Sequence, residues 1–489
     1  MLATGLTACG GSTSAPPPPP PVVASGLSAT DVDTVIQAAA LSVDAGMVIA
    51  VVDRGGKILA VAETPGAPAS GVGNFSASVN ARELAIALAR TAGFFSNDQA
   101  PLSSRTVRFI SGVHFPPGVT DAPVSDLYGI ENTNRGCFLS GAYLAGQSLE
   151  RAMLSDGTSP GLGIITGKGS LDDNDSTTVN AGGVPLFKGG AAVGGVGVVS
   201  ASNEISEFAA FSGAAAGFLP TAIPAPGVVI IGGVALPFVD QRTQPSGTTP
   251  GTSPASYVTG PVAGGLPPEG YLVGPSAGAS LTQDEVSTIV SQAVATAETT
   301  RAVIRLPQGS KTKMTIAVSD LDGTVLALYR MHDGTVFSAD VAVTKARNVI
   351  WFSGAGSGDL TPVPAGTAVT NRTIGFAAEP MYPPGIDGSG TGPFFNLFLN
   401  DVAHPCTQGS QAANANQSGI VFFPGSLSLY KNGVLVGGLG VSGDGVDQDD
   451  YVTAGGAAGF EAPEAIRADQ VVVDGVRLPY LKFPRNPTQ

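Results

Sequence analysis

The 489-residue sequence is poor in the residue types that most often carry catalysis. It contains 3 histidines, 3 cysteines and 1 tryptophan, and only 13% of its residues are charged. It has no Gly-x-Ser-x-Gly, His-Glu-x-x-His or P-loop motif, so the common nucleophile, metalloprotease and nucleotide sites are not indicated. The scarcity of these residue types and the lack of these motifs favour a binding module over an enzyme.

Positive charge is also scarce. The 24 Lys and Arg residues face 38 Asp and Glu, which gives a net charge of -14, and no basic run occurs. Nucleic acid is therefore not an expected partner. No apolar run reaches the roughly 18 residues that a membrane-spanning helix needs. The 43% of hydrophobic residues is nevertheless ample for the cores of two or three domains.

The first 26 residues have the character of an exported, tethered start. The stretch from Leu6 to Cys9 resembles a bacterial lipobox, in which the cysteine is acylated, and the Gly10 that follows is typical of outer-membrane lipoproteins. Because few residues precede Cys9, we expect the signal peptide to begin upstream. The six prolines of 16–21 predict a semi-rigid spacer. The expected location is the periplasm or cell surface, with the membrane reached through the lipid anchor only.

The rest of the chain repeats itself. Three pairs of segments match in the same order: 49–60 with 316–327, 115–119 with 382–386, and 187–198 with 430–441. The first two pairs are 267 positions apart and the third is 243 positions apart. We predict two tandem copies of one unit, residues 27–245 and 280–489, joined by a Gly/Pro/Ser/Thr-rich linker over 246–279.

Each copy has the same expected order of elements: a helix, a β-hairpin, a helix, a second hairpin and a last helix. Ser28 and Thr282 are suitable N-caps for the first helices, and Gly56 and Gly323 suit the first hairpin turns. The second hairpin is glycine-rich, which allows close backbone approach. The fold class is α+β, an antiparallel sheet flanked by helices, with long insertions at 119–184 and 386–426.

The second copy resembles the GlcG/HbpS family. The likeness is carried by an ordered set of short elements: the strand 315–320 with its Gly323 turn, Arg330-Met331, Lys345-Ala346-Arg347, and Ser442-Gly443. The resemblance implies a profilin-like α/β sandwich that often forms oligomers. It also implies a ligand-binding module, with haem or a related tetrapyrrole as the ligand.

The two copies depart from the family pattern to different degrees. In the second copy, His332 is inserted after the Arg-Met pair. In the first copy, Glu63 replaces the arginine, and the Lys-Ala-Arg position falls either on 83–85 or, with a loop gap, on 88–90. Both alignments lose the lysine. We therefore expect the ligand site within 281–460 and the first copy as its partner in an intrachain pseudo-dimer.

The resemblance implies a set of candidate ligand-binding residues in the second copy: Asp320, Arg330, Met331, His332, Lys345, Arg347 and Arg372. The cations among them suit a ligand with carboxylates, such as haem propionates, because a guanidinium binds a carboxylate through two parallel hydrogen bonds. The alternative is ordinary ion pairing with Asp320, Asp322 and Asp340. Asp53 and Asp320 end strands before turns, where a carboxylate commonly accepts turn N–H groups.

His332 and His114 are the candidate iron ligands, since haem iron accepts histidine and methionine. The position equivalent to His114 in the second copy is Met381, which suits ligation and equally suits drift at a loop site. His404 lies in an insertion and is expected to be a loop residue. Cys137 and Cys406 lie in the two insertions, and an oxidising compartment would permit a disulfide between them.

Three functions are compatible with these features. The first is an exported, lipid-anchored binding protein for haem or a related tetrapyrrole. The second is an enzyme acting on a small carboxylic acid, with Asp320, Arg330 and Lys345 as its polar set. The third is a structural or interaction lipoprotein without a small ligand.

Overall fold

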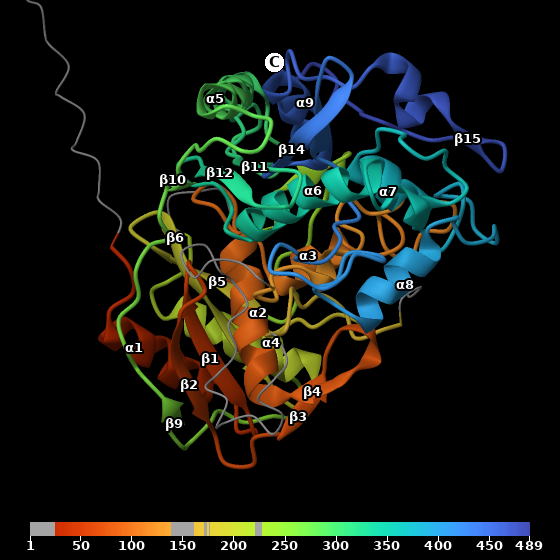
Figure 1. The fold of residues 1–489 in the computed structure, drawn as a ribbon. Coiled ribbons are helices and arrows are strands. Elements are labelled where there is room, and N and C mark those ends of the chain that lie inside the picture. Colours follow the sequence, from red (N-terminus) through yellow and green to blue (C-terminus); the bar gives the residue numbers. More distant parts are fainter. Residues whose placement is uncertain (1–24, 138–160, 171–173, 176, 221–226) are drawn as a thin grey trace, which may run out of the picture.

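The computed structural model describes residues 25–137, 161–170, 174–175, 177–220 and 227–489. These residues form two halves, each built on a five-stranded sheet. The half that contains the later, teal and blue elements lies above the red and orange half in Figure 1. No helix of the described ranges is both long and apolar enough to cross a membrane.

The two sheets are antiparallel and have the same strand order. The first sheet runs β5 (Gly183–Lys188), β6 (Ala191–Val199), β1 (Val48–Asp53), β2 (Ile58–Glu63) and β9 (Ser256–Thr259). The second runs β13 (Ser426–Lys431), β14 (Val434–Ser442), β11 (Thr315–Ser319), β12 (Val325–Arg330) and β10 (Gly270–Val273). Helices flank both sheets, so the predicted α+β class is confirmed.

The linker between the halves is part of both sheets. Its strands β9 and β10 lie within 246–279 and form the outer edges next to β2 and β12. Asp53 and Asp320 hold it further, because their carboxylates accept N–H groups from Gly265 and Ala279 at 3.0 and 2.7 Å. A composition typical of a free spacer thus belongs to an ordered segment with a fixed place in each sheet.

The first hairpins turn as their glycines predict. Gly56 and Gly323 have φ of 86° and 83°, in the left-handed region that favours glycine. The carboxylates of Asp53 and Asp320 each accept a turn N–H, from Lys57 and Leu321, at 2.9 Å. The expectation that these aspartates serve the turns is confirmed.

Two helices cover the outer face of each sheet. In the first half they are α1 (Ala29–Ala40) and α4 (Asn203–Ala215); in the second they are α5 (Gln283–Thr299) and α9 (Val446–Gly456). The predicted N-caps of α1 and α5 are confirmed, and each forms a full capping box, Ser28 with Asp31 and Thr282 with Glu285.

One helix covers the inner face of each sheet, α2 (Ala81–Phe95) in the first half and α6 (Phe337–Ser353) in the second. Glycines of β6 and β14 permit this contact, because a Cβ at Gly197 or Gly440 would collide with a carbonyl of the facing helix. Arg90 and Arg347 donate to the carbonyls of the equivalent turn glycines, Gly56 and Gly323, both at 3.0 Å. The alignment of Lys-Ala-Arg with 88–90 is therefore the correct one.

Short elements complete the chain. These are β3 (Ser70–Val72), β4 (Ser78–Asn80), α3 (Ser104–Phe109), β7 (Ile230–Ile231), β8 (Val234–Ala235), α7 (Asn371–Ala377), α8 (Phe395–Ala403), β15 (Val472–Val473) and β16 (Val476–Arg477). Helix α8 lies inside the second insertion and was not expected from the sequence.

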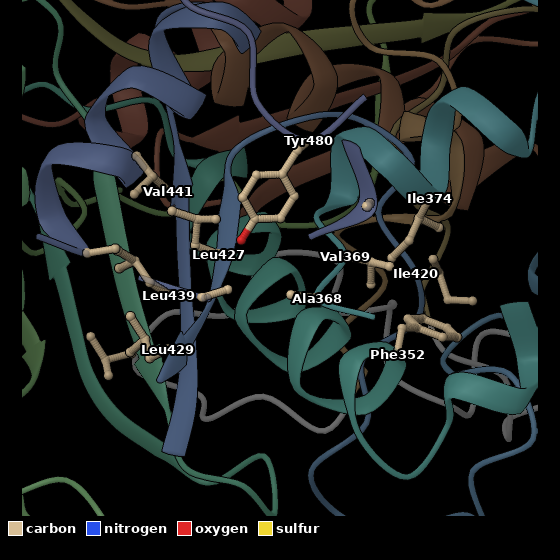
Figure 2. Close-up of a cluster of buried hydrophobic side chains, with 14 of the residues drawn as sticks. Phe352, Ala368, Val369, Ile374, Ile420, Leu427, Leu429, Leu439, Val441 and Tyr480 are labelled. Atoms are coloured by element: carbon tan, nitrogen blue, oxygen red, sulfur yellow. The ribbon is translucent and has the colours of Figure 1, made fainter. Parts of the chain in front are cut away.

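The largest apolar cluster belongs to the second half (Figure 2). Leu427 of β13 lies beside Tyr480, which comes from the last segment of the chain, and Leu439 of β14 and Leu429 of β13 continue the cluster along the strands. Gly438 and Gly440 face α6, so Leu439 and Val441 face the other side of the sheet, where Leu439 lies beside Gly456 of α9. Burial of these side chains is the main force that holds α9 and the C-terminal segment on that outer face.

The inner helices bring the halves together. The rings of Phe95, at the end of α2, and Phe337, at the start of α6, stack with centroids 3.9 Å apart. A chain of buried charges lies nearby: Asp333 binds Arg54 of the first half at 2.5 Å and Arg305 at 2.5 Å, and Arg305 also binds Asp444 at 2.5 Å. Both apolar and ionic contacts therefore join the halves.

Candidate functional site

A cleft of about 770 Å³ opens between the two halves. The first half supplies Phe75, Val113, His114 and Ser170, and the second supplies Pro380, Met381, Asp387, Gly388, Thr391, Phe395 and Leu399. Its volume lies within the range of roughly 300–1,000 Å³ that is usual for small-molecule sites. Most of the side chains that line the cleft are apolar, and the lining also includes one histidine and one carboxylate.

His114 is the most distinctive group in the cleft. Its side chain is buried, and its Nε2 lies 2.6 Å from Oδ1 of Asp387, which comes from the other half. Its Nδ1 is buried without a hydrogen-bond partner among the described residues. The hydrogen bond with His114 lowers the pKa of the Asp387 carboxyl. A buried imidazole held by a carboxylate, with its other nitrogen unused, is the arrangement that metal-ligating histidines commonly show.

Met381 lines the same cleft and is nearly buried. It stands 267 positions after His114, at the equivalent place of the second half. The tertiary structure thus brings the two equivalent positions to one cavity, which the sequence alone does not reveal.

A narrower polar pocket adjoins the cleft and shares Phe75, Val113 and Ser170 with it. Arg108 and Glu131 line it, and both are largely buried. Tyr128, stacked on Phe398 at 4.8 Å, also lines it. Burial, together with the nearby carboxylates of Glu379 and Glu131, raises the pKa of Tyr128, so its hydroxyl stays protonated. The cleft is therefore mainly apolar, and the pocket beside it is more polar and contains one guanidinium, that of Arg108.

The residues of the second-half hairpin lie elsewhere. Arg330 donates to the carbonyls of Gly334 and Pro268, at 2.9 and 3.1 Å. The sulfur of Met331 accepts the N–H of Met314 at 3.3 Å. His332 has 79% of its side chain exposed and binds Glu269 at 2.8 Å.

The other three predicted cations bind at two places. Arg347 binds at the hairpin turn, and Lys345 and Arg372 bind carboxylates of α9. Arg347 donates to Gly323 and to Ser418, at 3.0 and 3.1 Å. Lys345 binds Asp449 at 3.0 Å, and Arg372 binds Asp450 and Asp447 at 2.5 and 2.7 Å. Burial lowers the pKa of Lys345 and raises that of Asp449 to about 7.

The expected convergence of Arg330, Lys345, Arg347 and Arg372 on one ligand is therefore wrong. Each is buried and has found its own internal acceptor, because an unpaired charge inside a protein is costly. Of the alternative partners, Asp340 interacts with Arg347, whose charge lowers the pKa of the Asp340 carboxyl against the effect of burial. Asp320 and Asp322 accept N–H groups of the turn and the linker instead. The carboxylates that bind the other three cations lie on α9 and in the linker.

The three cysteines have two different expected roles, a disulfide and a lipidation site. Cys137 and Cys406 form a disulfide with their Cα atoms 5.3 Å apart, and it joins the two insertions. His404 is exposed in the loop beside it. Cys9, the proposed lipidation site, lies outside the described residues. Within the described ranges, no group of three or more His, Cys, Asp and Glu side chains could hold a metal ion.

The insertion residues of the cleft, Asp387, Phe395 and Leu399, were not predicted from the sequence. The insertion has no counterpart in the repeat, but apolar residues at 395, 398, 399 and 402 follow helical spacing, which could have predicted α8. A second signal was that His114 and Met381 are unlike residues at equivalent positions, and both are types that bind haem iron.

Comparison with known proteins agrees with the resemblance seen in the sequence. A family model described as haem degrading protein HbpS-like matches residues 281–458. The corrinoid adenosyltransferase PduO of Salmonella typhimurium is 26% identical over 150 residues, which make up 31% of this chain and 33% of PduO. The chain thus spans about a third of the length of that curated relative.

Solved structures of similar proteins cover part of the chain. A PduOC:heme complex is 19% identical, with a TM-score of 0.25, and the match covers 38% of this chain and 97% of that one. A double mutant of HbpS from Streptomyces reticuli is 19% identical, with a TM-score of 0.23, and the match covers 37% of this chain and 88% of that one. Residues 281–458, which hold four of the five strands of the second sheet together with α5, α6 and α9, are similar to the HbpS-like family.

Proposed function

We propose that this chain binds haem or a related tetrapyrrole in the cleft between its halves. The observation that carries the proposal is the meeting of His114 and Met381 in one largely apolar cavity of about 770 Å³. A tetrapyrrole is a broad apolar body with a metal at its centre and acidic groups at its edge. The cleft offers a matching apolar lining, two residue types that bind haem iron, and a cation nearby.

Three residues have distinct roles in this proposal. His114 would bind the iron, and Asp387 would orient its imidazole through the hydrogen bond at Nε2. Met381 is the second residue suited to the iron, and a His/Met pair raises the potential of a bound haem. Arg108, in the adjoining pocket, is suited to a propionate of the ligand. When bound, the group would supply ligand-exchange and electron-transfer chemistry at its iron.

The test is a titration with haemin, followed by the Soret band. We expect a shifted, saturable band in the wild type and an affinity reduced by more than about tenfold in His114→Ala. Asp387→Asn should weaken binding less, and Met381→Leu should change the spectrum at nearly constant volume of the side chain. His404→Ala, an exposed histidine outside the cleft, is the matched control.

The titration also separates this site from the one suggested by sequence. If His332→Ala abolishes the band while His114→Ala binds like the wild type, the second-half hairpin is the site and the cleft is not. If neither haemin nor cobalamin changes its spectrum with the wild type, the proposed function fails.

We also propose that the protein is exported and anchored by a lipid on Cys9, with the prolines as a spacer. This rests on the lipobox resemblance and the proline run. Mass spectrometry of the protein from its native membrane should find an acylated N-terminal cysteine. A Cys9→Ser variant that stays in the membrane fraction would contradict the proposal.

A further inference from the structure

A pocket of about 260 Å³ lies at the C-terminal end of α6 in the second half, and it shares no lining residue with the cleft. Ile350 and Leu435 give it an apolar part, and the indole of Trp351 lines it as well. A loop of the second insertion adds polar groups, the amides of Gln411 and Asn416. The pocket therefore combines an aromatic ring with uncharged hydrogen-bonding groups.

Trp351 is the only tryptophan of the chain. It is partly exposed, and it packs on the apolar cluster of the second half. Its Nε1 donates to Oδ2 of Asp359 at 3.0 Å. The indole is therefore held in place by the protein and still lines the pocket with an apolar ring.

Gln411 is oriented by its neighbours in the loop. Its Oε1 accepts from Nε2 of Gln408 at 2.9 Å and from Nε2 of Gln417 at 3.0 Å. Gln408 is itself fixed, because its Oε1 accepts from Nδ2 of Asn348 on α6 at 2.6 Å. Both of these bonds use the oxygen of Gln411, so its amide nitrogen keeps its N–H groups without a hydrogen bond among the described residues.

Asn416 is oriented in the opposite sense. Its Nδ2 donates to the carbonyl of Asp322 in the hairpin turn at 3.0 Å, and its Oδ1 has no hydrogen bond among the described residues. Gln411 and Asn416 are both partly exposed members of the pocket lining. The loop thus offers the pocket one free donor group and one free acceptor, each on a neutral amide whose other end is bonded.

The charged side chain in the lining is that of Arg347, and it is already bonded. Its guanidinium donates to the carbonyl of Gly323 and to Oγ of Ser418, at 3.0 and 3.1 Å. Within the described part of the chain, no carboxylate lines this pocket. A cation would therefore find no counter-charge, and the free amide groups suit an uncharged ligand that both donates and accepts hydrogen bonds.

The equivalent place in the first half is closed. Phe94 corresponds to Trp351, because each stands four residues after the arginine that donates to the hairpin turn glycine. Phe94 is only 1% exposed, and its carbonyl accepts the N–H of Val336 from the second half at 3.0 Å. The contact between the halves covers this place in the first half, whereas its counterpart in the second half is bordered by the insertion loop and stays open.

We propose that this pocket binds a small uncharged sugar, a hexopyranose, with one face of its ring on Trp351. Neighbouring hydroxyls of the sugar would bind Nε2 of Gln411 and Oδ1 of Asn416, because a hydroxyl both donates and accepts. The C–H groups of the ring form an apolar face that packs on the indole. At roughly 30 Å³ per water molecule, the pocket has the volume of about nine waters, which a ring of about twelve non-hydrogen atoms can occupy. This site is independent of the tetrapyrrole cleft.

The experiment follows the fluorescence of Trp351 in the intact protein without haemin. Because no second tryptophan contributes, a change on titration reports directly on this pocket. The probes are the methyl glycosides of glucose, galactose and mannose, together with cyclohexanol, a six-membered ring with a single hydroxyl, and adenine, a flat base. We expect a saturable change with at least one glycoside, and a weaker response to cyclohexanol and to adenine.

Variants of the two amides test the hydrogen bonds. Gln411→Ala and Asn416→Ala should each weaken binding of the glycoside by about three- to tenfold, the effect of one hydrogen bond. Gln470→Ala, an exposed glutamine outside the pocket, is the matched control and should bind like the wild type. Circular dichroism and thermal unfolding report whether each variant is folded, and Gln411→Ala serves if Asn416→Ala is not.

Trp351→Leu tests the aromatic contact by a second method, because the variant has no tryptophan signal. Saturation-transfer NMR should detect the glycoside on the wild type and lose most of that signal on the variant.

Four outcomes would overturn the proposal. The first is the absence of a saturable change with all three glycosides. The second is an equal or stronger response to cyclohexanol, which would show that the hydroxyls are not recognised, and the third is tighter binding of adenine. The fourth is equal glycoside affinity in the wild type, Gln411→Ala and Asn416→Ala. Haemin binding is measured separately, so its failure is not confused with any of these.

Discussion

The two halves share a scaffold, and one of the differences between them is a buried pair of positions that carries charge in the second half. In the second half, Lys345 of α6 binds Asp449 of α9 at 3.0 Å. The equivalent positions of the first half hold Leu88 and Ser206. A charge pair on one side of the molecule thus corresponds to an apolar and a small polar residue on the other.

The equivalence of these positions rests on contacts that both halves keep. Arg90 and Arg347 stand two residues after Leu88 and Lys345, and each donates to the carbonyl of a turn glycine. One residue after Ser206 and Asp449, an acid binds an arginine of the short helix α3 or α7: Glu207 with Arg105, and Asp450 with Arg372. The neighbours on both sides are therefore in register.

The comparison shows that the two members of this buried charge pair are either both present or both absent in a half. Loss of the lysine alone would leave a carboxylate unpaired in the interior, and loss of the aspartate alone would leave an ammonium unpaired. The first half lacks both.

The largest expected effect concerns the buried ion pairs of the second half that lie next to the contact between the halves. Arg305 binds Asp333 and Asp444, and Asp333 also binds Arg54 of the first half. Arg305→Met should lower the free energy of unfolding by about 3–5 kcal/mol, because it leaves buried Asp444 without its cation and Asp333 with Arg54 alone. Denaturant unfolding measures this.

The control for that prediction is Arg301→Met. Arg301 is only partly buried, and its guanidinium donates to the carbonyl of Arg485. The Arg301→Met substitution should lower the free energy of unfolding by less than about 1 kcal/mol. Equal stability of Arg305→Met and the wild type would show that the ion pairs of Arg305 contribute little to stability.

A second prediction places the residues of the first half at the two equivalent positions of the second half. Lys345→Leu should cost about 3–5 kcal/mol, since Asp449 loses its partner. Adding Asp449→Ser should recover much of that loss, because no buried charge then remains unpaired. A double-mutant cycle from denaturant unfolding gives the coupling between the two positions.

Lys431→Leu is a suitable control for the lysine. Lys431 pairs with Glu285 at 2.8 Å near the surface, where an ion pair contributes about 0–1 kcal/mol. If the double variant were less stable than Lys345→Leu, the explanation by paired loss of charge would be wrong.

A third prediction removes the covalent link between the insertions. The variant Cys137→Ser/Cys406→Ser should lose about 2–4 kcal/mol, because the unfolded chain regains the freedom that a crosslink 269 positions apart had removed. Unfolding of the wild type with a reductant should approach the value of the variant. Identical stability of variant and wild type without reductant would contradict the expectation.

The smallest effect concerns another difference between the halves. Asp401 and Asn132 each stand five positions before the cysteine of their own half, and Asn132 donates to Asp401 at 3.0 Å. Burial raises the pKa of Asp401 to about 7. Between about pH 4 and 7 the folded state then holds a proton that the unfolded state has lost, so this group's contribution to stability falls as the pH rises.

Asp401→Asn should remove that dependence. Relative to the wild type, the variant should gain up to about 1.4 kcal/mol per pH unit across this range. Urea unfolding at pH 4, 5, 6 and 7 measures the difference. Asp322→Asn, at an exposed turn, controls for loss of a carboxylate, and parallel curves for Asp401→Asn and the wild type would refute the assignment.

Features within a few residues of one another were predictable. The caps Ser28 and Thr282, the glycine turns and the turn aspartates Asp53 and Asp320 depend on local hydrogen bonds and backbone sterics. The α+β class followed from the order of these elements. The linker was misjudged in one respect, because a Gly- and Pro-rich composition does not exclude an edge strand such as β9 or β10.

Partners far apart in the chain were decided by the tertiary structure alone. Lys345 and Asp449 are 104 positions apart, and His114 and Asp387 are 273 apart. The sequence determined which side chains carry charge or bind iron, and where strands and helices begin. Only the folded structure decided which of them meet, because burial makes each charge take the nearest acceptor in space rather than the nearest in sequence.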